Sequence, residues 1–245
     1  KLGPDGSLLW QRRFGTGGQE WSAALALDSA GAVLVAGSTS RSLGGVNRGG
    51  RDAFVRKYDG EGNLLWTRQS GTEQEEEFTA LAVQADGAVL AAGRTSGALG
   101  GYNSGGMDVF LLKLDASGQV MWARQWGSEG DDAARRMVLD AAGEICVAGE
   151  MGGVDFVEKL DGAGARLWVR KMDSGMRVTD VAADGLGGVL VTGREGRGSV
   201  FVRRFGVNGE EQQRDEGIVL GSGEVSGLAL GRQGSVYVAA RLAGR

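Results

Sequence analysis

Carboxylates are the side chains of this sequence best suited to chemistry, because the chain contains no histidine. A Ser-His-Asp or Cys-His system and a His-ligated zinc or iron site are therefore excluded. Glu20, Glu76 and Asp132 occupy equivalent positions in three sequence repeats, and their oxygens could ring a cation such as Ca²⁺. No loop has the Asp-x-Asp-x-Asp spacing of a calcium loop, so solvated surface charge and loop capping are the stronger interpretation.

A pair of carboxylates could also hydrolyse a glycoside. Asp52 and Asp108 begin equivalent predicted strands, and their expected role is to accept backbone N–H bonds within a loop. One inner-strand position of the five repeats is occupied by Ala24, Ala80, Arg136, Asp180 and Gly227. Only one of these is acidic, so no catalytic pair is evident.

Candidate binding residues gather in irregular loops. Trp21 belongs to no repeated Trp position, and it could anchor a protein partner, stack on a sugar, or simply pack. Two long Gly-rich loops, within residues 37–54 and 93–110, add Arg41, Asn47, Arg48, Arg51, Tyr102 and Asn103. Loops on a rigid scaffold often bind ligands, but loops of this composition also pack on themselves.

A sequence repeat positions these residues. The phrase Lys-Leu/Tyr-x-x-x-Gly-x-Leu-x-Trp-x-Arg begins at Lys1, Lys57, Lys113 and Lys159, with variations, and an eroded copy begins at Arg204 with Gln213 in place of Trp. A second phrase, exemplified by residues 27–37, lies between successive Trp positions. Such a period is typical of stacked supersecondary units. The fixed register of the Trp residues favours packing between repeats, and Cys146 aligns with core aliphatic positions.

Each repeat contains four short runs rich in Val, Leu, Ala and aromatic residues. In the second copy they are residues 78–83, 88–92, 108–114 and 119–125, separated by turns that contain Asp and Gly. The 46 glycines among 245 residues agree with many tight turns. We therefore predict an all-β, five-bladed β-propeller with four antiparallel strands per blade, in a single domain over residues 1–245.

The two ends of the chain are predicted to complete one blade. The blades span about 22–70, 78–126, 133–171, 179–214, and 225–245 plus 1–14. The N-terminal strands 3 and 4 would thus pair with the C-terminal strands 1 and 2, closing the ring and removing an open edge. In this strand order the 4→1 and 2→3 loops, which carry all candidate binding residues, share one face.

A family resemblance supports this fold. The string from Asp52 to Trp66, Asp-Ala-Phe-Val-Arg-Lys-Tyr-Asp…Gly-Asn-Leu-Leu-Trp, resembles the SBBP-type bacterial beta-propeller repeat, as do the Leu-Gly-Gly-x-Asn-x-Gly-Gly strings at residues 43–50 and 99–106. The match covers nearly the whole chain and weakens after Val154 and again after Arg204. The resemblance implies a propeller, usually in secreted or envelope-associated bacterial proteins, and it brings no catalytic residues.

Composition narrows the function. With 27 basic and 31 acidic residues the net charge is −4, so we expect no nucleic-acid partner. The sequence has no run of about 18 apolar residues, so we expect no membrane insertion by this segment. The chain begins at Lys1 inside a repeat, so we expect a processed or partial product whose signal region would lie elsewhere.

We therefore predict a non-catalytic binding or scaffold module without a cofactor, which contacts a protein partner in a bacterial envelope or extracellular assembly. A carbohydrate-binding, lectin-like propeller is the alternative, and a glycoside-active enzyme the second alternative. A lectin should repeat its binding residues from blade to blade, and the irregular face does not repeat well.

Overall fold

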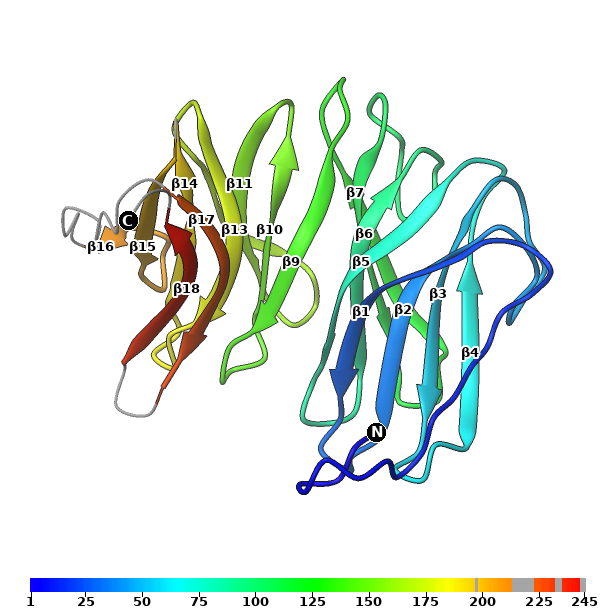
Figure 1. Ribbon diagram of the computed structural model, residues 1–245. Coiled ribbons are helices and arrows are strands. Elements are labelled where there is room, and N and C mark those ends of the chain that lie inside the picture. Colours follow the sequence, from blue (N-terminus) through cyan, green and yellow to red (C-terminus); the bar gives the residue numbers. More distant parts are fainter. Residues whose placement is uncertain (197, 213–222, 232–234, 243–245) are drawn as a thin grey trace. The chain divides into compact units, whose positions relative to one another are not determined.

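The computed structural model describes residues 1–196, 198–212, 223–231 and 235–242, and these residues are built from β-strands and loops (Figure 1). None of the described residues lies in a helix, so this part of the chain offers no helix that could cross a bilayer. The chain divides into two compact units, Lys1–Glu129 and Gly130–Arg245, each with its own apolar core. The all-β prediction is confirmed.

The N-terminal unit contains two four-stranded antiparallel sheets in which neighbouring strands follow the chain order. The first sheet comprises β1 (Glu20–Leu27), β2 (Val33–Thr39), β3 (Asp52–Tyr58) and β4 (Leu64–Ser70). The second comprises β5 (Glu76–Val83), β6 (Val89–Thr95), β7 (Asp108–Leu114) and β8 (Val120–Trp126). These are sheets of the β-propeller blade type.

The C-terminal unit repeats this design in shorter form. The third sheet comprises β9 (Ala133–Leu139), β10 (Ile145–Met151), β11 (Val154–Leu160) and β12 (Arg166–Lys171). The fourth comprises β13 (Met176–Ala183), β14 (Val189–Glu195), β15 (Ser199–Phe205) and β16 (Glu211–Gln212). β17 (Gly223–Leu230) and β18 (Val236–Leu242) form a two-stranded sheet.

The core of each unit lies between consecutive sheets. In the N-terminal unit, Leu34 and Val55 of the first sheet belong to one buried cluster with Phe78 and Phe110 of the second, whose rings stack with centroids 5.1 Å apart. Full burial of each such side chain stabilises the fold by about 1.5–3 kcal/mol. In the C-terminal unit, Cys146 lies in the corresponding cluster, and burial raises the pKa of its thiol to about 12. The predicted core position of this cysteine is confirmed.

Three copies of the repeated Trp each pack on a turn of the repeat that follows them. Its indole N–H donates to a turn carbonyl, from Trp10 to Gly60 (2.9 Å), Trp66 to Ala116 (3.0 Å) and Trp168 to Val207 (2.8 Å). The ring lies against a glycine of that turn, with φ of +83° at Gly62, +84° at Gly118 and +75° at Gly209. Positive φ and the close ring both favour glycine there. The prediction that these Trp residues pack between repeats is confirmed.

The repeated Lys forms an ion pair that the sequence pattern did not predict, and the pair is buried in the first and third sheets. Its partner is the Asp that begins the turn between strands 1 and 2 of the same sheet. The pairs are Lys57 with Asp28, Lys159 with Asp140 and, in the fourth sheet, Arg204 with Asp184, each at 2.9 Å. Both phrases of the sequence repeat thus meet in one contact, which fixes the hairpin of strands 1 and 2 against strand 3.

The predicted closure of a five-bladed ring is not confirmed. The expected N-terminal pair of strands 3 and 4 is reduced to one bridge, between Leu2 and Leu8, and residues 9–19 lie in no strand. The physical reason is that Lys1 and Leu2 align with Lys57 and Tyr58, the last two residues of β3. Parts of the two last predicted blades lie outside the described residues. In the fourth blade these are Gln213 and residue 214, and in the fifth they are residues 232–234 and 243–245.

Candidate functional site

Two long loops on the N-terminal unit carry most of the predicted binding residues. Loop A, residues 40–51, joins β2 to β3, and loop B, residues 96–107, joins β6 to β7. Both begin and end at the same edge of their sheets, as expected from the strand order. The third and fourth sheets replace them with short turns between β10 and β11 and between β14 and β15.

A glutamine on strand 4 fastens each loop to its sheet. Gln125 Oε1 accepts hydrogen bonds from the N–H groups of Leu99 (2.9 Å) and Gly100 (3.1 Å). Its Nε2 donates to Gly97 O (2.8 Å) and to Asp108 Oδ2 (3.0 Å). In loop A, Gln69 makes the same four types of bond, to Leu43, Gly44, Arg41 and Asp52. The two loops are thus held by one repeated device.

The sequence carries a signal for this device, although neither glutamine was among the predicted site residues. Gln stands three residues after the repeated Trp only where the loop of the same sheet is long, at Gln69 and Gln125. The equivalent positions of the other Trp-containing repeats are Arg13 and Lys171. A side chain that both donates and accepts is needed to satisfy a turn's carbonyls and N–H groups together.

The aspartates at the start of strand 3 complete the anchoring. Asp52 and Asp108 are fully buried, and they accept backbone N–H bonds from Arg48 (3.2 Å to Oδ2) and Ser104 (2.9 Å). The structure gives them the loop-capping contacts expected from the sequence. A catalytic nucleophile or general acid must be accessible to a substrate, and these two carboxylates are fully buried.

Glycines let both loops lie directly on the following segment of chain. A Cβ at Gly49 would lie 2.3 Å from the backbone of Glu73, and a Cβ at Gly105 would lie 2.3 Å from the backbone of Glu129. Any larger residue would force these segments apart. The loops are therefore close-packed structures, in agreement with the self-packing interpretation of their composition.

One apolar side chain projects from the same point of each loop. Val46 and Tyr102 both follow the Leu-Gly-Gly sequence and precede an asparagine, and they are 78% and 89% exposed. The two asparagine amides differ: Asn103 bonds to the backbone of Gly105 and Gly106, whereas Nδ2 of Asn47 is buried without a hydrogen-bond partner among the described residues. Rigid loops thus hold the side chain of Val46 and the aromatic ring of Tyr102 in water.

The other candidate contact residues lie around these loops. The guanidinium of Arg51 lies 5.1 Å from the ring centroid of Trp21 and also pairs with Glu75 at 2.7 Å. Trp21 itself is 42% exposed at the start of β1. Arg41 and Arg48 are exposed, and hydrogen bonds within loop A and to Asp52 fix their backbones. The structure therefore brings Trp21 and Arg51 together.

The predicted cation ring has local hydrogen-bond partners instead. Glu20 accepts from the hydroxyls of Thr16 (2.5 Å) and Thr39 (3.0 Å), and these bonds, Thr16 first, lower its pKa. Glu76 accepts from Thr72 and Thr95 in the same way, and Asp132 accepts from Gly152 N at 2.7 Å. Among the described residues, no group of three or more His, Cys, Asp or Glu side chains could hold a metal ion. These three carboxylates lie at the start of strand 1 of their sheets and accept local hydrogen bonds there.

The acidic inner-strand residue of the fourth sheet also has a structural partner. Asp180 accepts the backbone N–H of Leu228 at 2.9 Å, which ties β13 to β17 within the C-terminal unit. Its other oxygen lies 3.6 Å from Arg136 Nε. This arrangement agrees with the absence of a catalytic pair in the sequence pattern.

The comparisons with known proteins place limits on the identity of the chain. No protein-family model matches it, so the SBBP resemblance is not confirmed. Regulatory protein FlaEY of Caulobacter vibrioides is 32% identical over 164 residues, which are 60% of this chain and 17% of that protein. The chain therefore matches about a sixth of the length of this curated relative.

One solved structure is similar to this chain in fold, and a second aligns more weakly. A protein of unknown function from Bacteroides caccae aligns with a TM-score of 0.60 and 16% identity, covering 96% of this chain and 75% of that chain. Sqt1 from Chaetomium thermophilum aligns with a TM-score of 0.43 and 15% identity, covering 76% of this chain and 44% of that chain. At 16% identity the similarity to the Bacteroides caccae protein extends to the fold and leaves function open.

Proposed function

We propose that this chain is a non-catalytic β-propeller module that binds a protein partner through loops A and B. The observation that carries the proposal is the pair of exposed apolar side chains, Val46 and Tyr102, on loops that cannot retract them. Tyrosine supplies a large contact area at a low cost in side-chain entropy, which suits it to protein interfaces. Trp21 and Arg51, which contact each other beside loop A, are included in the proposed contact surface.

A protein partner fits this surface better than a carbohydrate. A sugar site needs polar side chains that are free to bond hydroxyl groups. Here the amides of Gln69, Gln125 and Asn103 are engaged within the loops. The exposed side chains of the two loops include Val46, Tyr102 and two arginines, and aromatic and Arg side chains are typical anchors of protein interfaces.

A non-enzymatic role agrees with the same bonds. The chain has no histidine, and the buried carboxylates Glu76, Asp52 and Asp108 each accept bonds from their own loop. The relative FlaEY is named as a regulatory protein. We infer a regulatory or assembly contact, in a bacterial envelope or extracellular setting as the SBBP resemblance suggests, with no cofactor.

We further propose that the five repeats form a closed five-bladed ring. Trp10 packs on Gly62 as Trp66 packs on Gly118, so residues 1–14 occupy the place of an outer strand that precedes the first sheet. Removing residues 236–242 should then lower the melting temperature of the N-terminal unit as well as that of the C-terminal unit. Independent melting of an unchanged N-terminal unit would contradict closure.

The function is tested by a double variant, Val46→Ser/Tyr102→Ser, compared with Leu65→Ser. Leu65 is 53% exposed on β4 and lies outside both loops, so it serves as the matched control. Proteins retained by the immobilised full chain from its native host should be lost with the double variant and kept with the control. Unchanged retention of proteins by the double variant would refute the proposal. Binding of the chain to a glycan array in place of a protein would refute it as well.

A further inference from the structure

Loop A carries three arginines that the fastening of the loop does not require. The two loops are held by the same bonds from Gln69 and Gln125, and both have the sequence Leu-Gly-Gly-x-Asn-x-Gly-Gly. Loop A nevertheless has arginine at three positions where loop B has a glycine, a serine and a methionine: Arg41 for Gly97, Arg48 for Ser104 and Arg51 for Met107. Because loop B makes the same bonds without these charges, the arginines are available for another role.

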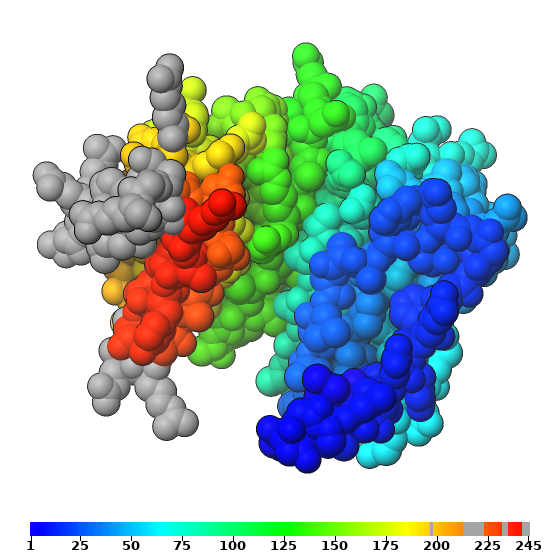
Figure 2. Space-filling model, viewed as in Figure 1, coloured from blue at the N-terminus to red at the C-terminus, as the bar shows by residue number. Residues whose placement is uncertain are grey.

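Two of these guanidinium groups face solvent without a carboxylate partner. Arg51 pairs with Glu75 at 2.7 Å and lies over the ring of Trp21. Arg41 and Arg48 are exposed, and within the described part of the chain neither side chain has an ion pair or a hydrogen-bond acceptor. The space-filling view shows the blue part of the chain, which includes loop A, at the surface of its unit (Figure 2). An anion from outside the molecule can therefore reach both groups.

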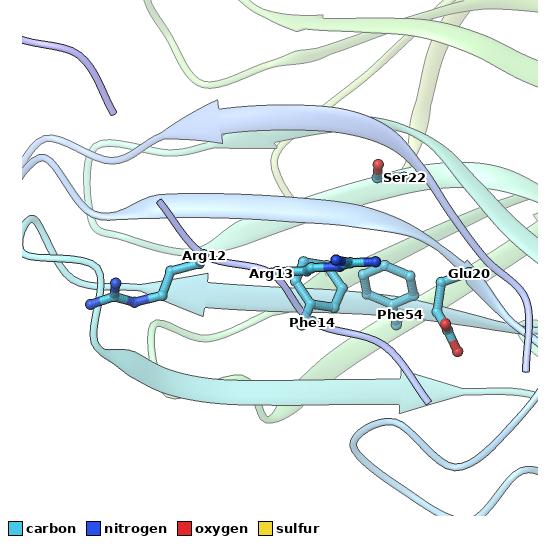
Figure 3. Close-up of a pocket in the computed structure, with 6 residues that line it drawn as sticks. All are labelled: Arg12, Arg13, Phe14, Glu20, Ser22 and Phe54. Carbon is cyan, nitrogen blue, oxygen red and sulfur yellow. The ribbon is translucent and has the colours of Figure 1, made fainter. Parts of the chain in front are cut away.

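The carboxylates next to loop A do not neutralise these two arginines. Glu20 accepts hydrogen bonds from the hydroxyls of Thr16 and Thr39. Figure 3 shows its carboxylate turned away from the two arginines of the N-terminal segment, at the edge of a pocket that Glu20 lines together with Phe54. Glu73 is exposed next to the loop, and among the described residues it forms no ion pair with loop A. The loop thus keeps a local positive charge.

Loop A is a positive patch on a negatively charged molecule. It contains three arginines and no acidic residue, whereas loop B contains no charged residue. The whole chain carries a net charge of −4, so its average field repels an acidic ligand. Attraction of such a ligand would therefore have to come from loop A, and it would weaken at high ionic strength, which screens exposed charges.

Loop A offers an anion side chains in place of a backbone cradle. Phosphate-binding loops typically point successive backbone N–H groups at the ligand. In loop A several of these groups already donate within the unit, namely those of Leu43, Gly44, Arg48 and Gly50. A guanidinium matches the two oxygens of a carboxylate in its own plane. Because Val46 is 78% exposed two positions before Arg48, loop A suits a polypeptide with both acidic and apolar side chains.

We propose that Arg41 and Arg48 make loop A the recognition site for an acidic segment of the partner protein, in which carboxylates flank an apolar residue. This inference rests on the proposed function, since the apolar residue of the segment would contact Val46. The two guanidinium groups bind the flanking carboxylates and select against neutral and basic segments. Loop B, with Tyr102 and no charge, adds contact area without this selectivity.

The probe is the acetylated and amidated peptide Glu-Glu-Leu-Glu-Glu, titrated into the full chain at about 20 mM salt, where screening is weak. We expect saturable binding with a dissociation constant below about 1 mM. The matched control peptide is Gln-Gln-Leu-Gln-Gln, which keeps the shape and removes the charge, and it should bind at least about tenfold more weakly. Binding of the Glu peptide should also weaken about tenfold or more at about 0.5 M salt.

Two double variants locate the site. Arg41→Gln/Arg48→Gln should weaken binding of the Glu peptide by about fivefold or more, as expected for two exposed ion pairs. Arg68→Gln/Arg124→Gln removes the same charge from exposed positions on β4 and β8, outside both loops, and should bind the peptide as the parent chain does. The two variants have the same net charge, so a difference between them isolates the location of the arginines.

Three results would overturn the inference: equal binding of the Gln peptide, equal loss in the two arginine variants, or displacement of the Glu peptide by inorganic phosphate at the same concentration. Retention of host proteins separates it from the proposed function. Retention lost with Val46→Ser/Tyr102→Ser but unchanged with Arg41→Gln/Arg48→Gln would overturn this inference and leave the proposed function standing. Glu-peptide binding that depends on the two arginines, together with retention unchanged in Val46→Ser/Tyr102→Ser, would keep the acidic recognition and contradict the proposed function.

Discussion

Replacing Gln125 by Ala tests whether loop B is a rigid element. The change removes four hydrogen bonds of 2.8–3.1 Å, three to neutral backbone groups and one to the buried carboxylate of Asp108. A neutral bond contributes about 1 kcal/mol net and a bond to a charged group about 2 kcal/mol. Because Gln125 is half-buried and water can replace some of these partners, we expect a loss of about 3 kcal/mol in the free energy of unfolding.

The assay is urea unfolding combined with hydrogen exchange of loop B, residues 96–107. Exchange should accelerate within that loop and remain unchanged in loop A. Met121→Ala is the matched control, because Met121 lies on the same strand, β8, and is 57% exposed, so its loss should be within about 0.5 kcal/mol. A loss below about 1 kcal/mol for Gln125→Ala, with loop exchange unchanged, would refute the idea that this residue makes the loop rigid.

Three further outcomes follow from the repeated contacts. Lys159→Met should cost about 3–5 kcal/mol in urea unfolding, because Asp140 would keep a buried charge without its partner; a loss under about 1 kcal/mol would contradict the buried pair. Burial opposes ionisation of Asp140, but bonds from Lys159 and backbone N–H groups outweigh it and lower its pKa. The contribution of Asp140 to stability should therefore be present above its unfolded pKa and disappear as the pH falls through its folded pKa. The stability deficit of Lys159→Met should then shrink in acid, and a deficit that grows in acid would contradict this expectation. Gly118→Ala should cost about 1–2 kcal/mol, since φ is +84° and a Cβ would lie 2.9 Å from the ring of Trp66; thermal unfolding at parent temperature would argue against that contact. Cys146 should resist alkylation until the chain unfolds, as its thiol is buried and has a pKa of about 12, and rapid labelling of the native chain would show an open core.

The repeat made the sheets predictable. A Trp nine residues after each Lys, and Asp/Gly turns at fixed offsets, specify strand, turn and register together, and local signals of this kind agree with the global fold. The stacking of Trp66 on the next turn also followed, because an aromatic in fixed register next to apolar neighbours has few other roles. Closure was harder to predict. Residues 1–14 carry the sequence phrase of a strand 3–4 pair, but that phrase starts at the end of strand 3.

The site was only partly predictable for a physical reason. Arg41, Asn47 and Asn103 were chosen for their polarity, and the loop itself uses their backbone or side-chain groups. Val46 was passed over because it is apolar, although an apolar side chain held in water is the stronger sign of a contact surface. Which side chains a loop turns outward depends on bonds between residues some 25 positions apart, such as Gln69 to Leu43, and single positions do not reveal them.

Trp21 illustrates the same limit from the other side. Its lack of a repeat position singled it out, and the structure places it under the guanidinium of Arg51 from loop A's end. That contact is worth about 0.5–1 kcal/mol at an exposed site and orders both side chains. The pairing of an isolated aromatic with a loop cation required the fold to bring β1 and β3 into one sheet.

Site-specific photocrosslinking tests the proposed binding role of loops A and B most directly. A photoreactive phenylalanine analogue is placed at Tyr102 in one variant and at Leu65 in another, and both are expressed in the native host. If the loops contact the partner, we expect a crosslinked protein from position 102 and none from position 65. Equal crosslinking at both positions, or none at position 102 while the chain still retains its partner, would contradict this role.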